Sequence, residues 1–354
     1  MQDRVSLHPG RVKLVPVAGQ ENTYDMVRAD SPTQDGTPLN KDTLLKDATA
    51  ALYGLGADAV PDDAFISLTN CFAQILVTTS PNTEVTASLN GKTVSATADS
   101  SGLAILKIPG FGTWTISATV NGASISFDYE IKAIAQYEIA LSTGLETTSW
   151  EVIDSISKSG NASSIWSVGD KKIIKLDGVS YTAQIIGFNH DTKTSGGKAG
   201  ITFQLVDCLN VSYKMNLSDT NVGGWKSSSL RSRMSEFLGQ LDEDLQSVIK
   251  AVNKRASVGN KTSTIETVSD KLFLLSEVEI FGSTTYSFTG EGSQYAYYKA
   301  GNTKVKKVNG SVKRWWERSP SSRIAGGFCD VYDDGTAANS KPTYDEGVSF
   351  GFCV

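Results

Sequence analysis

The chain has few of the residues that most enzymatic and metal sites require. Only two histidines, His8 and His190, occur among its 354 residues. It has four cysteines, Cys71, Cys208, Cys329 and Cys353. None of them are spaced as Cys-x-x-Cys. We expect them to be buried thiols in a chain made in a reducing cytoplasm. Cys329 and Cys353 could lie on neighbouring strands, so a late disulfide between them stays open.

Catalytic and ligand motifs are equally scarce. The sequence has no glycine-rich phosphate loop, nucleophile elbow or paired-carboxylate spacing. His190 stands alone in a polar loop, where a histidine is ordinarily solvated. Residues 330–335 begin like a calcium loop, but Tyr332 and Lys341 occupy the positions where such a loop needs carboxylates. We expect an Asp-Gly hairpin turn there instead, and we predict no catalytic residue, no metal site and no cofactor.

Long apolar runs and an excess of positive charge are also missing. No stretch approaches the roughly 18 consecutive apolar residues that span a membrane. The start of the chain lacks the apolar run of a signal peptide. The formal net charge is −5 and charged residues make up 20% of the chain, with no basic domain. We therefore expect no membrane insertion and no nucleic-acid partner.

Residues 1–69 form a first expected unit, for attachment or oligomerisation. A short extended run begins at Val12, and turn-rich polar residues follow. Asn40 opens an expected helix that ends near Gly54. Its apolar face is made by Leu44, Leu45, Ala48 and Leu52. One short helix cannot bury such a face alone, so it needs another copy of the chain or another protein. The alternative is a solvated arm whose helix packs on the next domain.

Residues 70–142 form a second expected unit, rich in Ser, Thr, Val and Ile. Period-two alternation predicts strands near 75–78, 84–89, 93–96, 104–108, 112–119 and 124–129. Asn90-Gly91 and Asn121-Gly122 are strong hairpin turns. About seven short strands at this spacing favour an immunoglobulin-like β-sandwich that acts as a spacer. Trp114 is expected in the core, although an aromatic carbohydrate site with Phe111 is the alternative.

Residues 143–354 form a third expected unit of α+β type. Asp177-Gly178 joins two strands in a type I′ hairpin. Helical periodicity follows, first in a helix capped near Ser228 and then in a second one that runs to Val252. Ser276 caps a further short helix, and the last eight residues predict a buried closing strand. The order of hairpin, helices and closing strands suits an α+β domain better than a parallel α/β sheet.

Several short elements of this third unit stand out in order along the chain. They are Trp225-Lys226-Ser227-Ser228-Ser229-Leu230-Arg231, Asp270-Lys271-Leu272-Phe273-Leu274-Leu275-Ser276, Glu291-Gly292-Ser293-Gln294-Tyr295, Trp315-Trp316-Glu317-Arg318-Ser319-Pro320 and Gly347-Val348-Ser349-Phe350-Gly351-Phe352. Over roughly residues 145–354 they resemble an uncharacterised domain family that recurs in phages and in genomes of Gram-positive gut bacteria. The resemblance implies a C-type-lectin-like fold, which phage tropism determinants use to display a variable binding face.

The other two units carry weaker resemblances. Residues 29–40 resemble the N-terminal region of phage tail-fibre and related structural proteins, where it precedes a helix used for attachment. Residues 93–114 resemble surface-protein spacer modules related to carboxypeptidase regulatory domains. In the third unit, Trp315, Trp316 and Arg318 are assigned to the core, with Arg318 tied to a loop carbonyl or carboxylate.

These observations predict a non-enzymatic phage virion protein, a tail fibre or receptor-binding protein made in the host cytoplasm. Its expected partners are a bacterial cell-surface glycan or protein, other virion proteins and further copies of itself, with a trimer as one option. Polar loops rich in Tyr, Ser, Gly, Asn and Asp suit adaptable contacts. The expected ligand-binding residues are Ser321, Ser322, Arg323, Tyr332, Asp334, Tyr344 and Asp345. The alternatives are a head or capsid decoration fibre and a secreted carbohydrate-active protein.

Overall fold

The computed structural model describes residues 5–6, 10–29, 32–34, 50–51, 55–56, 59–60, 62–63, 72–120, 122–142 and 144–354. The protein is β-rich, with 39% strand and 16% helix, as the sequence predicts for a β-rich multidomain chain. It divides into two compact units, Met1–Phe72 and Ala73–Val354. The expected helix face of Leu44, Leu45, Ala48 and Leu52 lies outside the described residues. No helix of the described part is long and apolar enough to cross a membrane.

The first unit contains an antiparallel hairpin of β2 (Val12–Pro16) and β3 (Tyr24–Arg28). A second short pair joins β1 (Val5–Ser6) to β4 (Pro32–Gln34). Every residue of β2 is exposed, so this hairpin has no core of its own beneath it. An isolated two-stranded hairpin is marginally stable in water at best.

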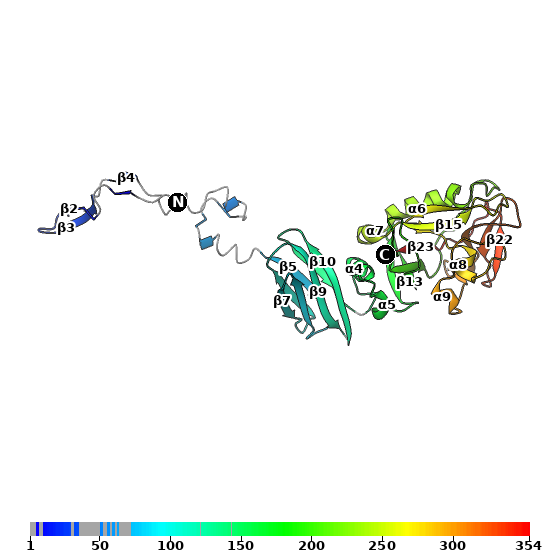
Figure 1. Ribbon diagram of the computed structural model, residues 1–354, viewed down its shortest axis with the longest axis horizontal. Coiled ribbons are helices and arrows are strands. Elements are labelled where there is room, and N and C mark those ends of the chain that lie inside the picture. Colours follow the sequence, from blue (N-terminus) through cyan, green and yellow to red (C-terminus); the bar gives the residue numbers. More distant parts are fainter. Residues whose placement is uncertain are drawn as a thin grey trace. The chain divides into compact units, whose positions relative to one another are not determined.

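Seven strands at the start of the second unit form two sheets that share one core (Figure 1). The four-stranded sheet has the order β10-β9-β6-β7, made of Ala123–Ile131, Gly112–Val120, Glu84–Leu89 and Lys92–Thr97. The three-stranded sheet has the order β11-β5-β8, made of Gln136–Ala140, Ala73–Thr78 and Leu103–Ile108. Trp114 is 1% exposed and belongs to the core, as expected. The sequence analysis missed β11, which pairs in parallel with β5.

Six of these strands follow the alternation in the sequence because each buries one face. In β9, for example, Trp114, Ile116 and Ala118 point inward while the intervening residues do not. The Asn90-Gly91 turn has positive φ at both residues, 49° and 78°, which is the type I′ geometry expected for a two-residue hairpin.

The rest of the second unit is built on a five-stranded sheet of order β12-β13-β14-β23-β17. Its strands are Lys171–Leu176, Val179–Phe188, Ile201–Leu205, Gly351–Cys353 and Leu272–Phe273. The closing strand β23 therefore lies between β14 and β17, and Phe352 is fully buried. The expectation of a buried terminal strand is confirmed. The Asp177-Gly178 turn also has positive φ at both residues, as expected.

Helices pack around this sheet. They are α4 (Trp150–Ser159), α5 (Ala162–Ile165), α6 (Ser229–Gln240), α7 (Glu243–Val248), α8 (Glu277–Phe281) and α9 (Ala296–Lys299), with a single 3₁₀ turn η1 (Trp225–Ser227) before α6. Ser228 caps α6 by accepting from the Arg231 backbone N–H, and Ser276 caps α8 in a complete capping box with Glu279. Both caps confirm the sequence analysis.

The sequence analysis missed one helix and extended another too far. The segment from Trp150, for which no helix was expected, forms the helix α4. The helix expected to reach Val252 ends at Val248, and Val252 begins the strand β15 (Val252–Ser257). Val248, Ile249 and Val252 are all buried. Their spacing resembles one face of a helix, but the backbone changes from helix to strand between Val248 and Val252.

The remaining strands form small antiparallel sheets. β15 pairs with β16 (Ile265–Asp270), β18 (Lys306–Val308) pairs with β19 (Ser311–Lys313), and β20 (Trp315–Pro320), β21 (Phe328–Val331) and β22 (Ala337–Ser340) form a three-stranded sheet. All six residues of β20 are buried, which confirms the core assignment of Trp315, Trp316 and Arg318.

Candidate functional site

The three-stranded sheet β20-β21-β22 places the expected ligand-binding residues at two ends. Phe328 pairs with Pro320 and with Ser340 at one end of β21, whereas Val331 pairs with Trp315 and Ala337 at the other. Loop 321–327 and the turn after Ser340 therefore lie at the Phe328 end, and turn 332–336 lies at the Val331 end. A four-residue strand separates the two ends by about 10 Å. The expected residues thus do not form one cluster.

The loop 321–327 is held in shape by its own hydrogen bonds. The Ser321 backbone N–H donates to Gly327 O at 2.8 Å, and the Ser321 hydroxyl accepts from the backbone N–H groups of Arg323 and Ile324. Ser321 is fully buried, so it shapes the loop and is not available to a ligand. Ser322 is half-buried and donates through its hydroxyl to Tyr286 O. The exposed Arg323 guanidinium lies 4.6 Å from the centre of the Tyr286 ring.

A segment that the sequence analysis did not select, residues 216–222, joins this loop to the turn after Ser340. The Asn221 side chain donates to Gly327 O at 2.7 Å. The Thr343 hydroxyl donates to an Asp219 carboxylate oxygen, and Lys341 lies 3.2 Å from the other one. The Thr343 hydrogen bond is the main cause that lowers the pKa of Asp219. We call residues 216–222, 321–327 and 341–345 the Asp219 face.

The Asp219 face exposes large apolar and aromatic side chains. Leu217 is 83% exposed, Val222 64%, Ile324 47% and Tyr344 50%. Asp345 is also exposed and lies 3.3 Å from the Lys214 ammonium. Clustered exposed apolar groups on segments that are otherwise hydrogen-bonded in place are a common mark of interaction surfaces. The sequence does not predict that Leu217 and Val222 are exposed, because an apolar residue within a polar loop is ordinarily expected to be buried.

At the other end of the sheet, Tyr332 and Asp334 have local partners. The Arg314 guanidinium lies 4.0 Å from the centre of the Tyr332 ring. Asp334 accepts from both the backbone N–H and the hydroxyl of Thr336, which lowers the pKa of its carboxyl. The Gly335 N–H donates to Tyr332 O, so this segment is the Asp-Gly turn that the sequence predicts. Both side chains are exposed, but they are separate from the Asp219 face.

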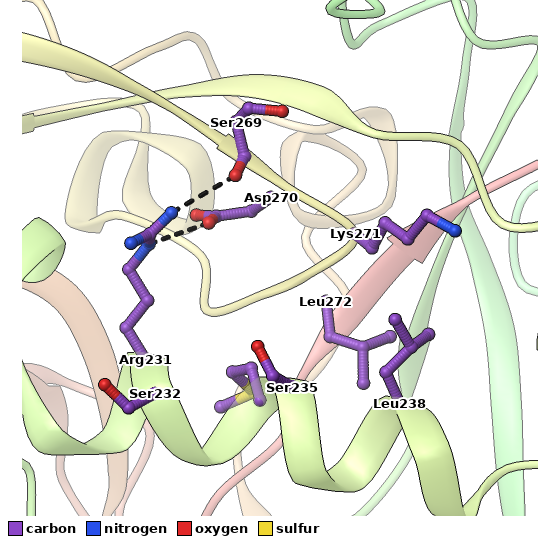
Figure 2. Close-up of a pocket in the computed structure, with 9 residues that line it drawn as sticks. Arg231, Ser232, Ser235, Leu238, Ser269, Asp270, Lys271 and Leu272 are labelled. Atoms are coloured by element: carbon purple, nitrogen blue, oxygen red, sulfur yellow. Dashed lines mark hydrogen bonds and ion pairs between the residues drawn. The ribbon is translucent and has the colours of Figure 1, made fainter.

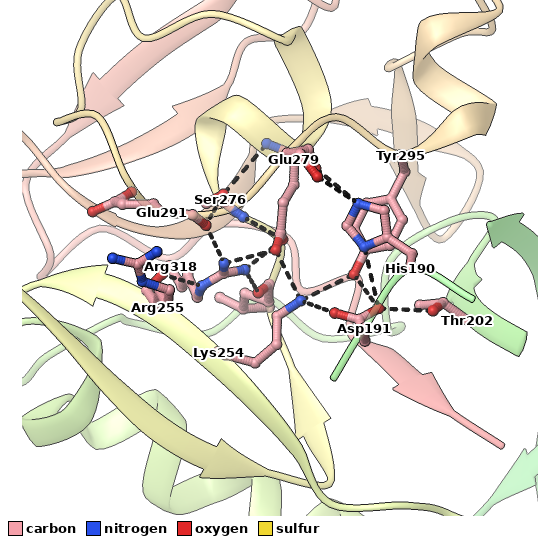
Figure 3. A network of polar contacts seen from close by, with 12 residues as sticks. His190, Asp191, Thr202, Lys254, Arg255, Ser276, Glu279, Glu291, Tyr295 and Arg318 are labelled. Carbon is pink, nitrogen blue, oxygen red and sulfur yellow. Dashed lines mark hydrogen bonds and ion pairs between the residues drawn. The ribbon is translucent and has the colours of Figure 1, made fainter. Parts of the chain in front are cut away.

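A buried charge network surrounds Arg318 of β20 (Figure 3). Arg318 is its centre and satisfies all five of its N–H donors. The guanidinium binds both carboxylate oxygens of Glu279, at 2.5 and 2.8 Å, and donates to three backbone carbonyls, those of Arg255, Leu274 and Glu291. The Glu279 carboxylate is the dominant cause that raises the pKa of Arg318 against the effect of burial. The predicted tie of Arg318 to a carbonyl or carboxylate is confirmed.

Lys254 extends the network to a second carboxylate. Its ammonium donates to Glu279 at 2.8 Å, to Asp191 at 2.7 Å and to the Tyr295 hydroxyl at 2.9 Å. Burial alone would raise the pKa of Asp191, but Lys254 and His190 together outweigh it and hold that pKa well below its usual value. Two cations thus face two carboxylates in a fully hydrogen-bonded group, which is the condition for charges to be tolerated in a core.

His190 closes the outer edge of this network, where the sequence analysis expected a solvated loop histidine. Its ring packs on Tyr295 at 4.0 Å between centroids, and its Nε2 lies 3.0 Å from Ser293 O. The His190 side chain is only 19% exposed. The expectation was wrong because residues 103 positions away in the chain come to cover the loop.

The described cysteines are Cys208, Cys329 and Cys353, all of them buried free thiols. Cys329 lies on β21 and Cys353 on β23, in different sheets, and no disulfide joins them. Burial raises the pKa of both thiols well above the usual value, so they are unreactive at neutral pH. Within the described residues, no group of three or more His, Cys, Asp or Glu side chains is placed to hold a metal ion.

Comparison with known proteins gives a match over the C-terminal part of the chain. No curated protein and no solved structure matches the chain. Residues 201–354, which include the whole Asp219 face, match a family model described as a domain of unknown function (DUF6273).

Proposed function

We propose that this chain is a phage virion protein, a tail fibre or receptor-binding protein, and that it recognises the host cell surface through the Asp219 face. The observation that carries the proposal is the combination of exposed Leu217, Val222, Ile324 and Tyr344 with loops that are hydrogen-bonded to one another. A surface that is ordered before binding loses little conformational entropy when a partner arrives. A bacterial surface glycan or protein is the proposed partner.

The remaining parts of the chain have supporting roles in this proposal. Residues 1–69 attach the protein to the particle, and the two-sheet unit acts as an immunoglobulin-like spacer. Residues 143–354 adopt a C-type-lectin-like arrangement in which the buried network around Arg318 keeps the loops in place. The complete satisfaction of Arg318 supports this role, because a fixed frame limits movement of β20 and of the loop that follows it.

The proposal is tested by adsorption competition with the purified full chain. The protein should block attachment of particles that carry this chain to host cells. Ile324→Asp with Tyr344→Ala should weaken the block, since both side chains lie on the Asp219 face. Surface substitutions such as these should change the free energy of unfolding by only about 0.5 kcal/mol.

Tyr332→Ala is the matched control, because Tyr332 is an exposed tyrosine at the other end of the same sheet. It should leave the competition unchanged. A folded wild-type chain that never competes at saturating concentration would contradict receptor binding and favour a decoration fibre on the head or capsid.

A further inference from the structure

A hollow of about 440 Å³ lies between helix α6 and the strands β16 and β17 (Figure 2). Two of the distinctive sequence elements meet there, one around Trp225 to Arg231 and the other around Asp270 to Ser276. The Trp225 indole N–H donates to Asp270 Oδ2 at 2.8 Å, and Arg231 Nε donates to Asp270 Oδ1 at 2.8 Å. Asp270 is only 6% exposed, so this joint is buried. The size is within the range of small-molecule sites, about 300–1,000 Å³.

The walls of the hollow combine charge, hydroxyls and apolar surface. Arg231 and Lys271 are cations, and Asp270 is the single carboxylate, so the lining carries one net positive charge. The hydroxyl-bearing residues are Ser232, Ser235 and Ser269, and the apolar ones are Met234, Leu238 and Leu272. Figure 2 shows Arg231 extending from α6 toward Ser269 and Asp270, with Leu238 and Leu272 away from it in the same hollow.

Hydrogen bonds hold the Arg231 guanidinium in place but do not occupy all of its N–H groups. Besides Asp270, it donates to Ser269 O at 3.2 Å and to Lys226 O at 3.4 Å. Three of its five N–H groups are therefore occupied, and two are not used by any residue in the described part of the chain. Free N–H groups on a guanidinium suit an anion such as a carboxylate, because a hydrogen bond between charged partners is stronger than one between neutral groups.

We propose that this hollow binds a small carboxylate-bearing sugar. The carboxylate would face Arg231, the sugar hydroxyls would meet Ser232 and Ser235 on α6, and the C–H face of the ring would lie on Leu238 and Leu272. Lys271 lies on the side of the hollow away from Arg231 and would attract the anion only at longer range. This inference rests on the proposed recognition of a cell-surface glycan and narrows its chemistry to an acidic one. The hollow is a separate site from the Asp219 face, because no residue is common to both.

The test uses the purified full chain and titrates D-glucuronate, D-glucose and glucose 6-phosphate by calorimetry or ligand-observed NMR. Glucuronate should bind at least about tenfold more tightly than glucose, which carries a hydroxymethyl group in place of the carboxylate. Lys271→Gln should weaken glucuronate binding about two- to threefold, through loss of long-range attraction, and leave glucose binding unchanged. Ser235→Phe, which fills the hollow from the exposed side of α6, should abolish both.

Two control variants separate this site from other effects. Lys171→Gln removes an exposed lysine on β12, outside the hollow, and should not change the affinity for glucuronate. Tyr344→Ala alters the Asp219 face and should also leave the affinity for glucuronate unchanged. Loss of adsorption and loss of sugar binding are therefore distinguishable. Equal affinities for glucuronate and glucose, binding of the phosphate sugar alone, or glucuronate binding that Lys271→Gln and Ser235→Phe do not alter would overturn the proposal.

Discussion

The buried carboxylates of the C-terminal part differ sharply in how well they are partnered. Glu279 binds Arg318 and Lys254 and is ionised, because these two cations outweigh the effect of burial and lower its pKa. Glu317, one residue before Arg318, is also fully buried, yet neither of its carboxylate oxygens has a hydrogen-bond partner among the described residues. Burial, followed by the nearby Glu277 and Asp330, raises the pKa of Glu317 well above its usual value. The folded protein therefore favours the protonated form of Glu317.

This assignment predicts a pH dependence of stability. The unfolded chain releases the Glu317 proton above about pH 4.5, whereas the folded protein retains it. The stability that depends on Glu317 is thus fully present below that pH and is lost as the pH rises through the raised folded pKa. Glu317→Gln, which stays neutral, should unfold at a higher denaturant concentration than the wild type at pH 8. Each unit of raised pKa corresponds to about 1.4 kcal/mol.

Denaturant melts at pH 5 and pH 8 measure this effect. Glu236→Gln is the control, because Glu236 is exposed and should change neither midpoint. The stability of Glu317→Gln should still depend somewhat on pH, since burial also raises the pKa of Glu291 to about 7. If Glu317→Gln loses stability at pH 8, the carboxyl is ionised and held by a partner.

Among the elements, the closing strand β23 contributes most to joining distant parts of the chain. It pairs with β14 on one side and with β17 on the other, although β14 lies about 150 residues earlier. The Phe352 ring stacks on Phe203 with centroids 5.2 Å apart and meets the edge of Trp150 at 6.0 Å. This three-residue strand thereby connects α4, the five-stranded sheet and the sequence element from Asp270 to Ser276, through Leu272.

Phe352→Ala should lower the free energy of unfolding by about 3–5 kcal/mol, because it removes a fully buried ring and leaves a cavity. Deletion of residues 350–354 should unfold the C-terminal part altogether. Thermal and denaturant melts followed by circular dichroism measure both. Phe111→Ala is the matched control, since Phe111 is 58% exposed and should cost little. A Phe352→Ala protein that melts with the wild type would show that the strand is peripheral.

At the scale of the whole molecule, the β2–β3 hairpin of the N-terminal unit exposes apolar side chains. Leu14 faces Met26 across the β2–β3 hairpin, and they are 58% and 72% exposed. Val12 and Tyr24 share that face of the hairpin and are also exposed. Lys13 and Asp25 lie on the opposite face, because neighbouring residues of a strand point to opposite sides. Val15 and Val27, on the same side as Lys13 and Asp25, are exposed as well, so apolar side chains on both faces of the hairpin support the proposed assembly through residues 1–69.

Leu14→Asp with Met26→Asp should therefore reduce the mass of the full chain in light scattering from that of an oligomer toward that of a monomer. Lys13→Asp places the same residue type on the opposite face and should leave the mass unchanged. An oligomer that survives the double substitution intact would exclude this hairpin face from the assembly contact.

Local patterns were sufficient to predict most of the strands and caps. Alternation identified six strands of the two-sheet unit, and Asn90-Gly91, Asp177-Gly178 and the Ser276 cap each depend on residues within a few positions of one another. Such features follow from backbone conformation and short-range hydrogen bonds, which a sequence displays directly. The apolar residues of β20 and β23 likewise predicted burial.

Contacts between residues far apart in the sequence decided the pairing of buried charges and the grouping of loops. Arg318 and Lys254 both meet Glu279, His190 meets Ser293, and residues 216–222 join two loops more than 100 positions later. Sheet register placed Tyr332 and Tyr344 at separate ends of one sheet, although they are close in sequence. The sequence by itself determined most strands of the two-sheet unit, the hairpin turns and the helix caps, because these depend on neighbouring residues. Only the tertiary structure decided which charges are paired and which loops share a face, because these depend on how the segments pack together.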